Sequence, residues 1–195
     1  MNKILLVFLI VVLFPLNTLA ADKDKDFAVK GLAAASCATF VEEREKLSQT
    51  YGEAMSWLTG YISAYNYLKP DTYDVAPWQS AELLSFIIAA HCKDNPEESF
   101  FHASNRLINS IEKDRLRLTS EVITISIGDH KLTMYKDMVF RIQSALKDKG
   151  HLNIRWATGD YDQSTIDAMK AFQTESKIGV TGVPDQESLF LLFSK

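Results

Sequence analysis

The stretch GDYDQSTIDAMKAFQTESKIGVTGVPDQESLFLLF, residues 159–193, decides the fold of the C-terminal part of this 195-residue chain. Asp162 is placed to cap a helix, because its carboxylate can accept hydrogen bonds from the free amides of a first turn. Lys177 marks the last turn of that helix. Gly182 favours a turn after this helix, and Asp185 is a candidate N-cap for a second helix. Apolar residues at helical spacing give each helix one inward face: Ile166, Met169 and Phe172, then Leu189, Leu192 and Phe193.

A similar pattern precedes this stretch. Asp137 is expected to cap an earlier helix that closes with Lys147, Lys149 and Gly150. The inward residues of that helix are Val139, Ile142 and Leu146. Three short Asp-capped helices joined by glycine turns predict a small, self-contained bundle.

The same residues carry a family resemblance. They are Ile142-Gln143, Leu146, Gly150, Gly159-x-Tyr161, Ser164-Thr165, Ala168-Met169, Phe172-Gln173 and Val180-Thr181-Gly182-Val183. In this order and spacing the segment 136–195 resembles the three-helix peptidoglycan-binding domain of bacterial wall proteins. Asp162 departs from the pattern, because the family usually has Gly after the aromatic residue.

Loop and helix-start residues of this segment are the candidate ligand contacts. Their hydroxyls, carboxylates and helix N-terminal amides suit the amide and carboxylate groups of a peptidoglycan stem peptide. Gln143 and Gln173 are expected to satisfy main-chain groups of loops, and Phe172 to fill the core. The predicted ligand-binding residues are Asp160, Tyr161, Asp162, Thr165 and Thr181.

Residues 1–20 have the pattern of a signal peptide. Lys3 supplies the positive start, residues 4–14 form an apolar run, and Thr18-Leu19-Ala20 offers small residues for cleavage. The run is about half the length that a membrane span needs, although an uncleaved anchor is the alternative reading. The sequence therefore predicts export to the periplasm, with secretion as the alternative, and no membrane span after cleavage.

The formal net charge of the chain is −4, without a basic cluster that would indicate nucleic acid or anionic lipid as a partner. Residues 21–34 begin with ADKDKDF, which alternates charges without a core pattern and predicts a flexible lead-in.

Cys37 and Cys92 are the two cysteines of the chain. An even pair in an exported protein predicts a disulfide. Such a bond would stabilise the fold by about 3 to 4 kcal/mol in the chain-entropy model. A reactive thiol or a metal ligand is the alternative, but His91 and His102 do not lie at ligand spacing from the cysteines.

The segment 35–118 has helical periodicity throughout. One short helix follows Cys37 and carries Phe40, Val41 and Leu47. A second ends before Lys69-Pro70, and Ser80 is expected to cap a third. Asn95-Pro96-Glu97-Glu98 has the composition of a helix start and predicts a fourth helix from there.

This segment also carries a resemblance, on Ser36-Cys37-x-x-Phe40-Val41, Leu58-Thr59-Gly60-Tyr61, Ile88-x-x-x-Cys92-x-x-x-Pro96 and Phe100 or Phe101. Over about residues 35–111 it is similar to the HdeA-type fold. That group contains periplasmic acid-stress chaperones and, more distantly, immunity proteins that neutralise wall-degrading toxins.

Between the helical segments, residues 122–135 change to a period of two. Three isoleucines alternate with polar residues before Gly128-Asp129, and Leu132 and Met134 alternate with polar residues after it. The pattern predicts a β-hairpin. An isolated hairpin is only marginally stable in water, so its isoleucine face is expected to dock on one of the two bundles. The alternative is that the whole segment 119–135 is merely an ordered linker.

Catalytic and metal sites are not indicated. The histidines, His91, His102, His130 and His151, fall in different predicted elements without ligand spacing, and no carboxylate pair stands out. Among the aromatic residues, Trp57, Tyr61, Tyr65 and Tyr67 follow core spacing, whereas Tyr73 and Trp78 in a loop are better surface candidates.

The sequence thus predicts a mainly α protein. A disulfide-tied four-helix N-terminal domain over 35–118 and a three-helix bundle over 136–195 are joined by the hairpin. The predicted function is non-catalytic binding of peptidoglycan in the periplasm, without cofactor or metal, by a protein that serves as an adaptor for wall remodelling or secretion. The alternative is a wall-anchored chaperone or immunity protein whose partner is another periplasmic protein; an enzyme is the third reading.

Overall fold

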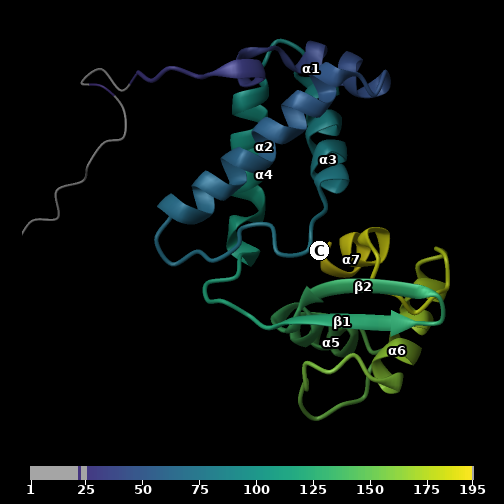
Figure 1. Cartoon of the computed structure of the whole chain (residues 1–195). Coiled ribbons are helices and arrows are strands. Elements are labelled where there is room, and N and C mark those ends of the chain that lie inside the picture. Colours follow the sequence, from purple (N-terminus) through teal and green to yellow (C-terminus); the bar gives the residue numbers. More distant parts are fainter. Residues whose placement is uncertain (1–21, 23–25, 195) are drawn as a thin grey trace, which may run out of the picture.

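The computed structural model describes residue 22 and residues 26–194. The chain is mainly helical, with one antiparallel hairpin, as predicted (Figure 1). The predicted signal peptide and part of the predicted lead-in lie outside the described residues. None of the helices within the described ranges has the length and apolar character needed to cross a membrane.

Residues 31–118, named here the N-terminal unit, contain four α-helices in the described part of the chain. They are α1 (Cys37–Glu45), α2 (Gln49–Leu68), α3 (Ala81–Asp94) and α4 (Phe100–Ile111), with short 3-10 turns at Gly31–Ala34 and Glu112–Asp114. A serine caps the N-terminus of each α-helix by accepting a hydrogen bond from the main-chain amide three residues later. The capping residues are Ser36, Ser48, Ser80 and Ser99.

The core of the N-terminal unit lies around a disulfide. Cys37 and Cys92 are bonded, as predicted, and both are buried, so α1 is fixed covalently to the last turn of α3. Phe100 is fully buried beside this bond and stacks on Phe40, with ring centroids 4.5 Å apart. This core therefore brings together α1, α3 and α4.

The predicted start of the fourth helix at Asn95 is wrong. α4 begins after Ser99, because residues 95–98 form a turn that holds the beginning of α1. The Glu98 main-chain oxygen accepts from the amide of Cys37 at 2.7 Å. The Glu98 carboxylate binds His91 and Arg106, and these two hydrogen bonds, His91 first, lower the pKa of Glu98. The turn therefore connects three helices instead of starting one.

Two further expectations for this unit are corrected. Leu47 does not lie on α1, which ends at Glu45; it follows the helix with φ 48° and is 76% exposed. Tyr67 is 88% exposed near the end of α2, so it is not a packing residue.

The hairpin consists of β1 (Val122–Ile127) and β2 (His130–Tyr135), paired with Ile127 opposite His130. It packs on the C-terminal helices, because Ile125 and Met134 are buried in the same core as α5 and α6. Of the two readings, docking is confirmed: the hairpin is part of the C-terminal core. Residues 122–194 are named here the C-terminal unit.

The helices of the C-terminal unit are α5 (Lys136–Asp148), α6 (Gln163–Glu175) and α7 (Gln186–Phe193). Asp162 caps α6 and Asp185 caps α7, as predicted. Asp137 is not a cap, because α5 begins one residue earlier, directly from the end of β2. Lys177 is not in the last turn of α6; it lies two residues beyond the end of the helix, with φ 58°.

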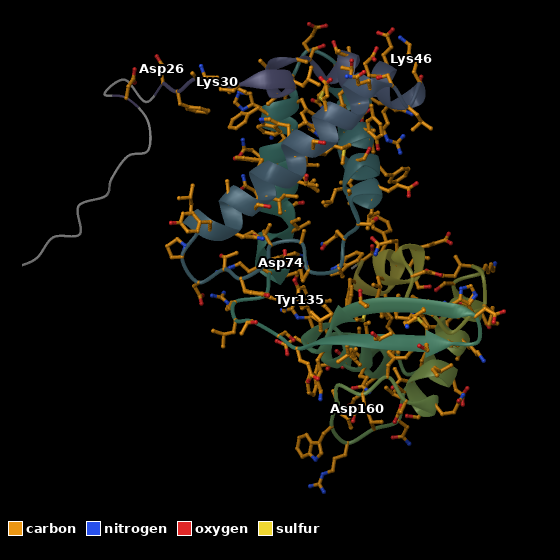
Figure 2. The ribbon with its side chains drawn as sticks, in the orientation of Figure 1. Asp26, Lys30, Lys46, Asp74, Tyr135 and Asp160 are labelled. Atoms are coloured by element: carbon orange, nitrogen blue, oxygen red, sulfur yellow. A yellow bond between two sulfur atoms is a disulfide. The ribbon has the colours of Figure 1, made fainter. Side chains whose placement is uncertain are left out.

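Side chains from both units meet along one boundary. The guanidinium of Arg141 on α5 donates to the main-chain oxygens of Asp114 and Arg115. Tyr135 lies beside Asp74 in Figure 2, and burial, followed by the negative charge of Asp74, raises the pKa of Tyr135 to about 12. The two buried cores are thus separate, but loop residues of the N-terminal unit contact the C-terminal unit directly.

Candidate functional site

The loop between α5 and α6 is held by one buried glutamine. The side-chain oxygen of Gln143 accepts from the amides of Thr158 and Gly159, at 2.8 and 3.0 Å. Its side-chain nitrogen donates to Asp160 O at 2.9 Å and to Thr165 Oγ1 at 3.0 Å. A buried amide that satisfies so many groups of one loop fixes the loop's shape. This arrangement is named here the first glutamine clamp.

The loop between α6 and α7 is held in the same way. Gln173 accepts from the amides of Thr181 and Gly182, at 2.9 and 2.7 Å. It donates to Val183 O at 3.0 Å and to Ser188 Oγ at 2.9 Å. Both glutamines were predicted to satisfy main-chain groups of loops, and this is confirmed. The Gln173 arrangement is the second glutamine clamp.

The two clamped loops are a structural repeat. Thr158-Gly159-x-x-Asp162-Gln163-x-Thr165 corresponds to Thr181-Gly182-x-x-Asp185-Gln186-x-Ser188, with a helix-capping Asp at the same position. In both, the glycine has φ 76°. The positive φ favours glycine at this position of the repeat. At Gly159 a side chain would also clash with Phe140, because a Cβ atom there would lie 2.6 Å from the Phe140 ring. The shared loop motif is visible in the sequence, although only the roles of the two glutamines were predicted from it.

Asp162 and Thr165, predicted to face ligand, are engaged within the first loop. The Asp162 carboxylate accepts from the amide of Thr165 at 2.9 Å and from the Thr165 hydroxyl at 2.8 Å. These bonds, the main-chain one first, lower the pKa of Asp162. Thr165 is fully buried, between Asp162 and Gln143.

Tyr161 joins the two loops to each other, whereas Thr181 is engaged within the second loop. The Tyr161 hydroxyl donates to Gly182 O at 2.9 Å, and burial raises the pKa of Tyr161 strongly. The Thr181 hydroxyl accepts from the amide of Val183 at 3.0 Å. Tyr161, Asp162, Thr165 and Thr181 therefore shape the loops through their own side-chain bonds.

Asp160 is the predicted residue that projects most freely. Its carboxylate is 75% exposed and lies 3.8 Å from the Lys136 ammonium. Trp156, in the same loop, is 72% exposed, and the Arg155 guanidinium lies over its ring at 5.3 Å. Arg155 and Trp156 are not among the residues predicted to bind ligand. An aromatic residue and an arginine in a loop between predicted helices are the available signal.

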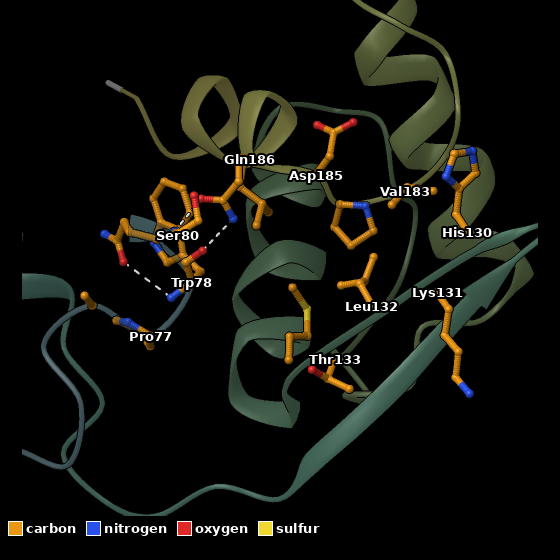
Figure 3. A pocket seen from close by; sticks show the side chains of 15 residues that line it. Pro77, Trp78, Ser80, His130, Lys131, Leu132, Thr133, Val183, Asp185 and Gln186 are labelled. Carbon is orange, nitrogen blue, oxygen red and sulfur yellow. Dashed lines mark hydrogen bonds between the residues drawn. The ribbon is translucent and has the colours of Figure 1, made fainter. Parts of the chain in front are cut away.

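The second clamped loop also forms one wall of a hollow of about 440 Å³. The other walls are β2 at residues 130–134 and the loop 76–80 of the N-terminal unit (Figure 3). This hollow is named here the junction pocket. Gln186 closes one side, because its side chain donates to Trp78 O and accepts from the amide of Ser80, both at 2.7 Å. Trp78, expected at the surface, is half-buried and packs on Phe193.

These two clamped loops and three helices agree with a known domain. Residues 136–190 match the family model described as "Putative peptidoglycan binding domain". The predicted resemblance of this segment is thereby confirmed, and the match supports peptidoglycan binding by the C-terminal unit. No curated protein and no solved structure matches the chain.

Within the matched residues 136–190 and the rest of the described chain, no group of three or more His, Cys, Asp or Glu side chains is placed to hold a metal ion. His91 pairs with Glu98, and His151 lies 3.4 Å from Glu175 on α6. His130 stands at the rim of the junction pocket. The arrangement around the loops is suited to hydrogen bonding and to packing against a ligand.

Proposed function

We propose that this protein is exported, binds peptidoglycan through residues 136–195 without cleaving it, and presents its N-terminal unit at the cell wall as an adaptor. The observation that carries the proposal is the family match over residues 136–190, together with two intact glutamine clamps. The Cys37–Cys92 bond fits an oxidising compartment such as the periplasm.

Wall contact is assigned to the side chains that the first clamped loop displays. Trp156 offers a flat face for a sugar ring, and Arg155 offers a cation for a carboxylate. Asp160 is the predicted ligand residue that takes direct contact in this proposal. Tyr161, Asp162, Thr165 and Thr181 contribute by holding the displayed groups in place.

The test is co-sedimentation of the mature full-length chain with purified sacculi. We expect saturable binding that soluble wall fragments compete away. The Trp156→Ala variant should bind less, whereas Leu47→Ala, an equally exposed apolar truncation in the N-terminal unit, should bind as the parent does. A folded chain that stays in the supernatant with sacculi of several wall types would refute the proposal.

A further inference from the structure

The free edge of β2 is the starting point. The strands are joined by the two residues Gly128 and Asp129, and Gly128 has φ 56°. In a two-residue hairpin the residues that flank the turn, here Ile127 and His130, form a hydrogen-bonded pair, and the pairs alternate from there. Thr124 and Thr133 therefore form a non-hydrogen-bonded pair, and the main-chain groups of each point away from the hairpin.

The outer edge of β2 runs along the junction pocket. One face of a strand contributes every second residue, but the consecutive residues 130–134 all line this pocket. The pocket therefore follows the strand edge, where the N–H and C=O groups of Lys131 and Thr133 point. In the described part of the chain these main-chain groups have no partner. Unpaired groups on a strand edge are a template for an extended peptide.

The size and chemistry of the pocket favour a short, charged peptide. About 440 Å³ lies in the range of pockets for small ligands. Its lining includes the apolar residues Met134 and Pro184 and, labelled in Figure 3, Leu132; they are named here the apolar floor. The rim carries one charge of each sign, Lys131 and Asp185, and neither has an ion pair among the described residues.

We propose that the junction pocket binds the stem peptide of peptidoglycan, which adds to the edge of β2 as a short third strand. The main-chain groups of Thr133 and Lys131 hydrogen-bond the peptide's amides, and small alanine side chains fit the apolar floor. Lys131 meets a carboxylate of the peptide and Asp185 its free amine. This inference rests on the proposed function and adds the N-terminal unit to the site, because residues 76–80 form one wall.

The hairpin offers a matched pair of variants. Thr133→Pro removes the outward amide of β2 while leaving the hairpin's own hydrogen bonds intact, since proline is tolerated on a strand edge. Thr124→Pro makes the same change directly opposite, on the edge of β1, whose residues do not line the pocket. Both threonines are exposed, so the two variants carry similar folding costs.

The experiment uses the mature full-length chain and three probes: intact sacculi, the soluble stem tetrapeptide released by an amidase, and glycan strands stripped of peptide. Binding is followed by calorimetry and by amide resonances. We expect the stem peptide to shift the Thr133 and Lys131 amides. Thr133→Pro should weaken binding at least about tenfold, since a main-chain hydrogen bond is lost, and Thr124→Pro should leave the affinity within about twofold.

Failures of the two proposals are distinguishable. If the parent chain does not bind sacculi, the proposed function and this inference both fall. If it binds sacculi and stripped glycan but the stem peptide leaves the Thr133 amide unshifted, only the assignment of the junction pocket is overturned. If an all-L isomer of the tetrapeptide binds equally well, the pocket is a site for protein segments. This result would also overturn its assignment to the stem peptide.

Discussion

Gln186 and Trp78 join the two units of this protein: the side-chain nitrogen of Gln186 donates to the main-chain oxygen of Trp78 at 2.7 Å. The same side chain accepts from the amide of Ser80, which lies 106 residues away in the chain. Gln186 begins α7, so the boundary between the units is built on the second clamped loop. In the repeat, Gln163 holds the equivalent position but binds Asp167 on its own helix.

Replacement of Gln186 by alanine should therefore weaken the boundary. The Ser80 amide would lose its acceptor, and we expect the free energy of unfolding to fall by about 1 to 3 kcal/mol. Gln163→Ala is the matched control and should change it by less than about 0.5 kcal/mol, because Gln163 is exposed. Equal effects of the two variants in urea unfolding would contradict a role for Gln186 in joining the units.

Loss of a clamp should be far more destabilising. Gln173→Ala leaves the amides of Thr181 and Gly182 without their acceptor and opens a cavity in the core. We expect about 3 kcal/mol or more of lost stability. Thr174→Ala, at the neighbouring exposed position on α6, serves as the control and should be nearly neutral. Thermal unfolding of both variants measures the difference.

Asp162 gives a pH-dependent prediction. Its pKa is lowered in the folded protein, so the unfolded state binds more protons as the pH falls. The stabilisation is complete above the ordinary Asp pKa of 3.8 and is lost as the pH falls through the lowered value. Asp162→Ala should cost about 1 kcal/mol at pH 7, and the difference from the parent should shrink in acid.

Asp162→Asn separates the cap from the charge. Asparagine still accepts the amide hydrogen bond but does not titrate, so this variant should be nearly as stable as the parent at pH 7. Urea unfolding at a series of pH values checks both changes. A parent-to-alanine difference that stays constant down to pH 2 would show that the carboxylate's charge contributes nothing.

Reduction of the disulfide should affect the two units unequally. Cys37 and Cys92 lie in the N-terminal core, and the C-terminal core contains neither. Loss of about 3 kcal/mol should lower the melting temperature of the N-terminal unit by about 10 °C or more and leave the other nearly unchanged. Calorimetry with and without reductant measures both transitions. A single transition that shifts as a whole would mean that the boundary makes one cooperative fold.

Local chemistry explains which parts of the fold were predictable. The disulfide, the Ser80, Asp162 and Asp185 caps and the hairpin each follow from residues close in sequence or from a simple count. The start of α4 was mispredicted because Glu98, a good first-turn residue by composition, instead binds His91 and Arg106. Tertiary partners decided its role, and no local pattern reveals them.

The site was harder to predict than the fold. The predicted ligand residues were selected for their polar groups, but most of those groups are used to hold the loops; they are Asp160, Tyr161, Asp162, Thr165 and Thr181. The junction pocket joins segments around residues 78, 132 and 185, which come together only through the packing of the two units. Trp156 could have been selected from the sequence, because an aromatic residue there fits no helical face.

The glutamine clamps have a consequence for engineering. Because Gln143 and Gln173 fix the loops from inside, the displayed positions 155, 156 and 160 contribute little to folding. The residues that hold the fold are thus separate from the residues that the loop exposes, and the exposed ones can be varied. A library randomised at these positions should retain the fold in most members, so new binding specificities could be selected without a compensating search for stability.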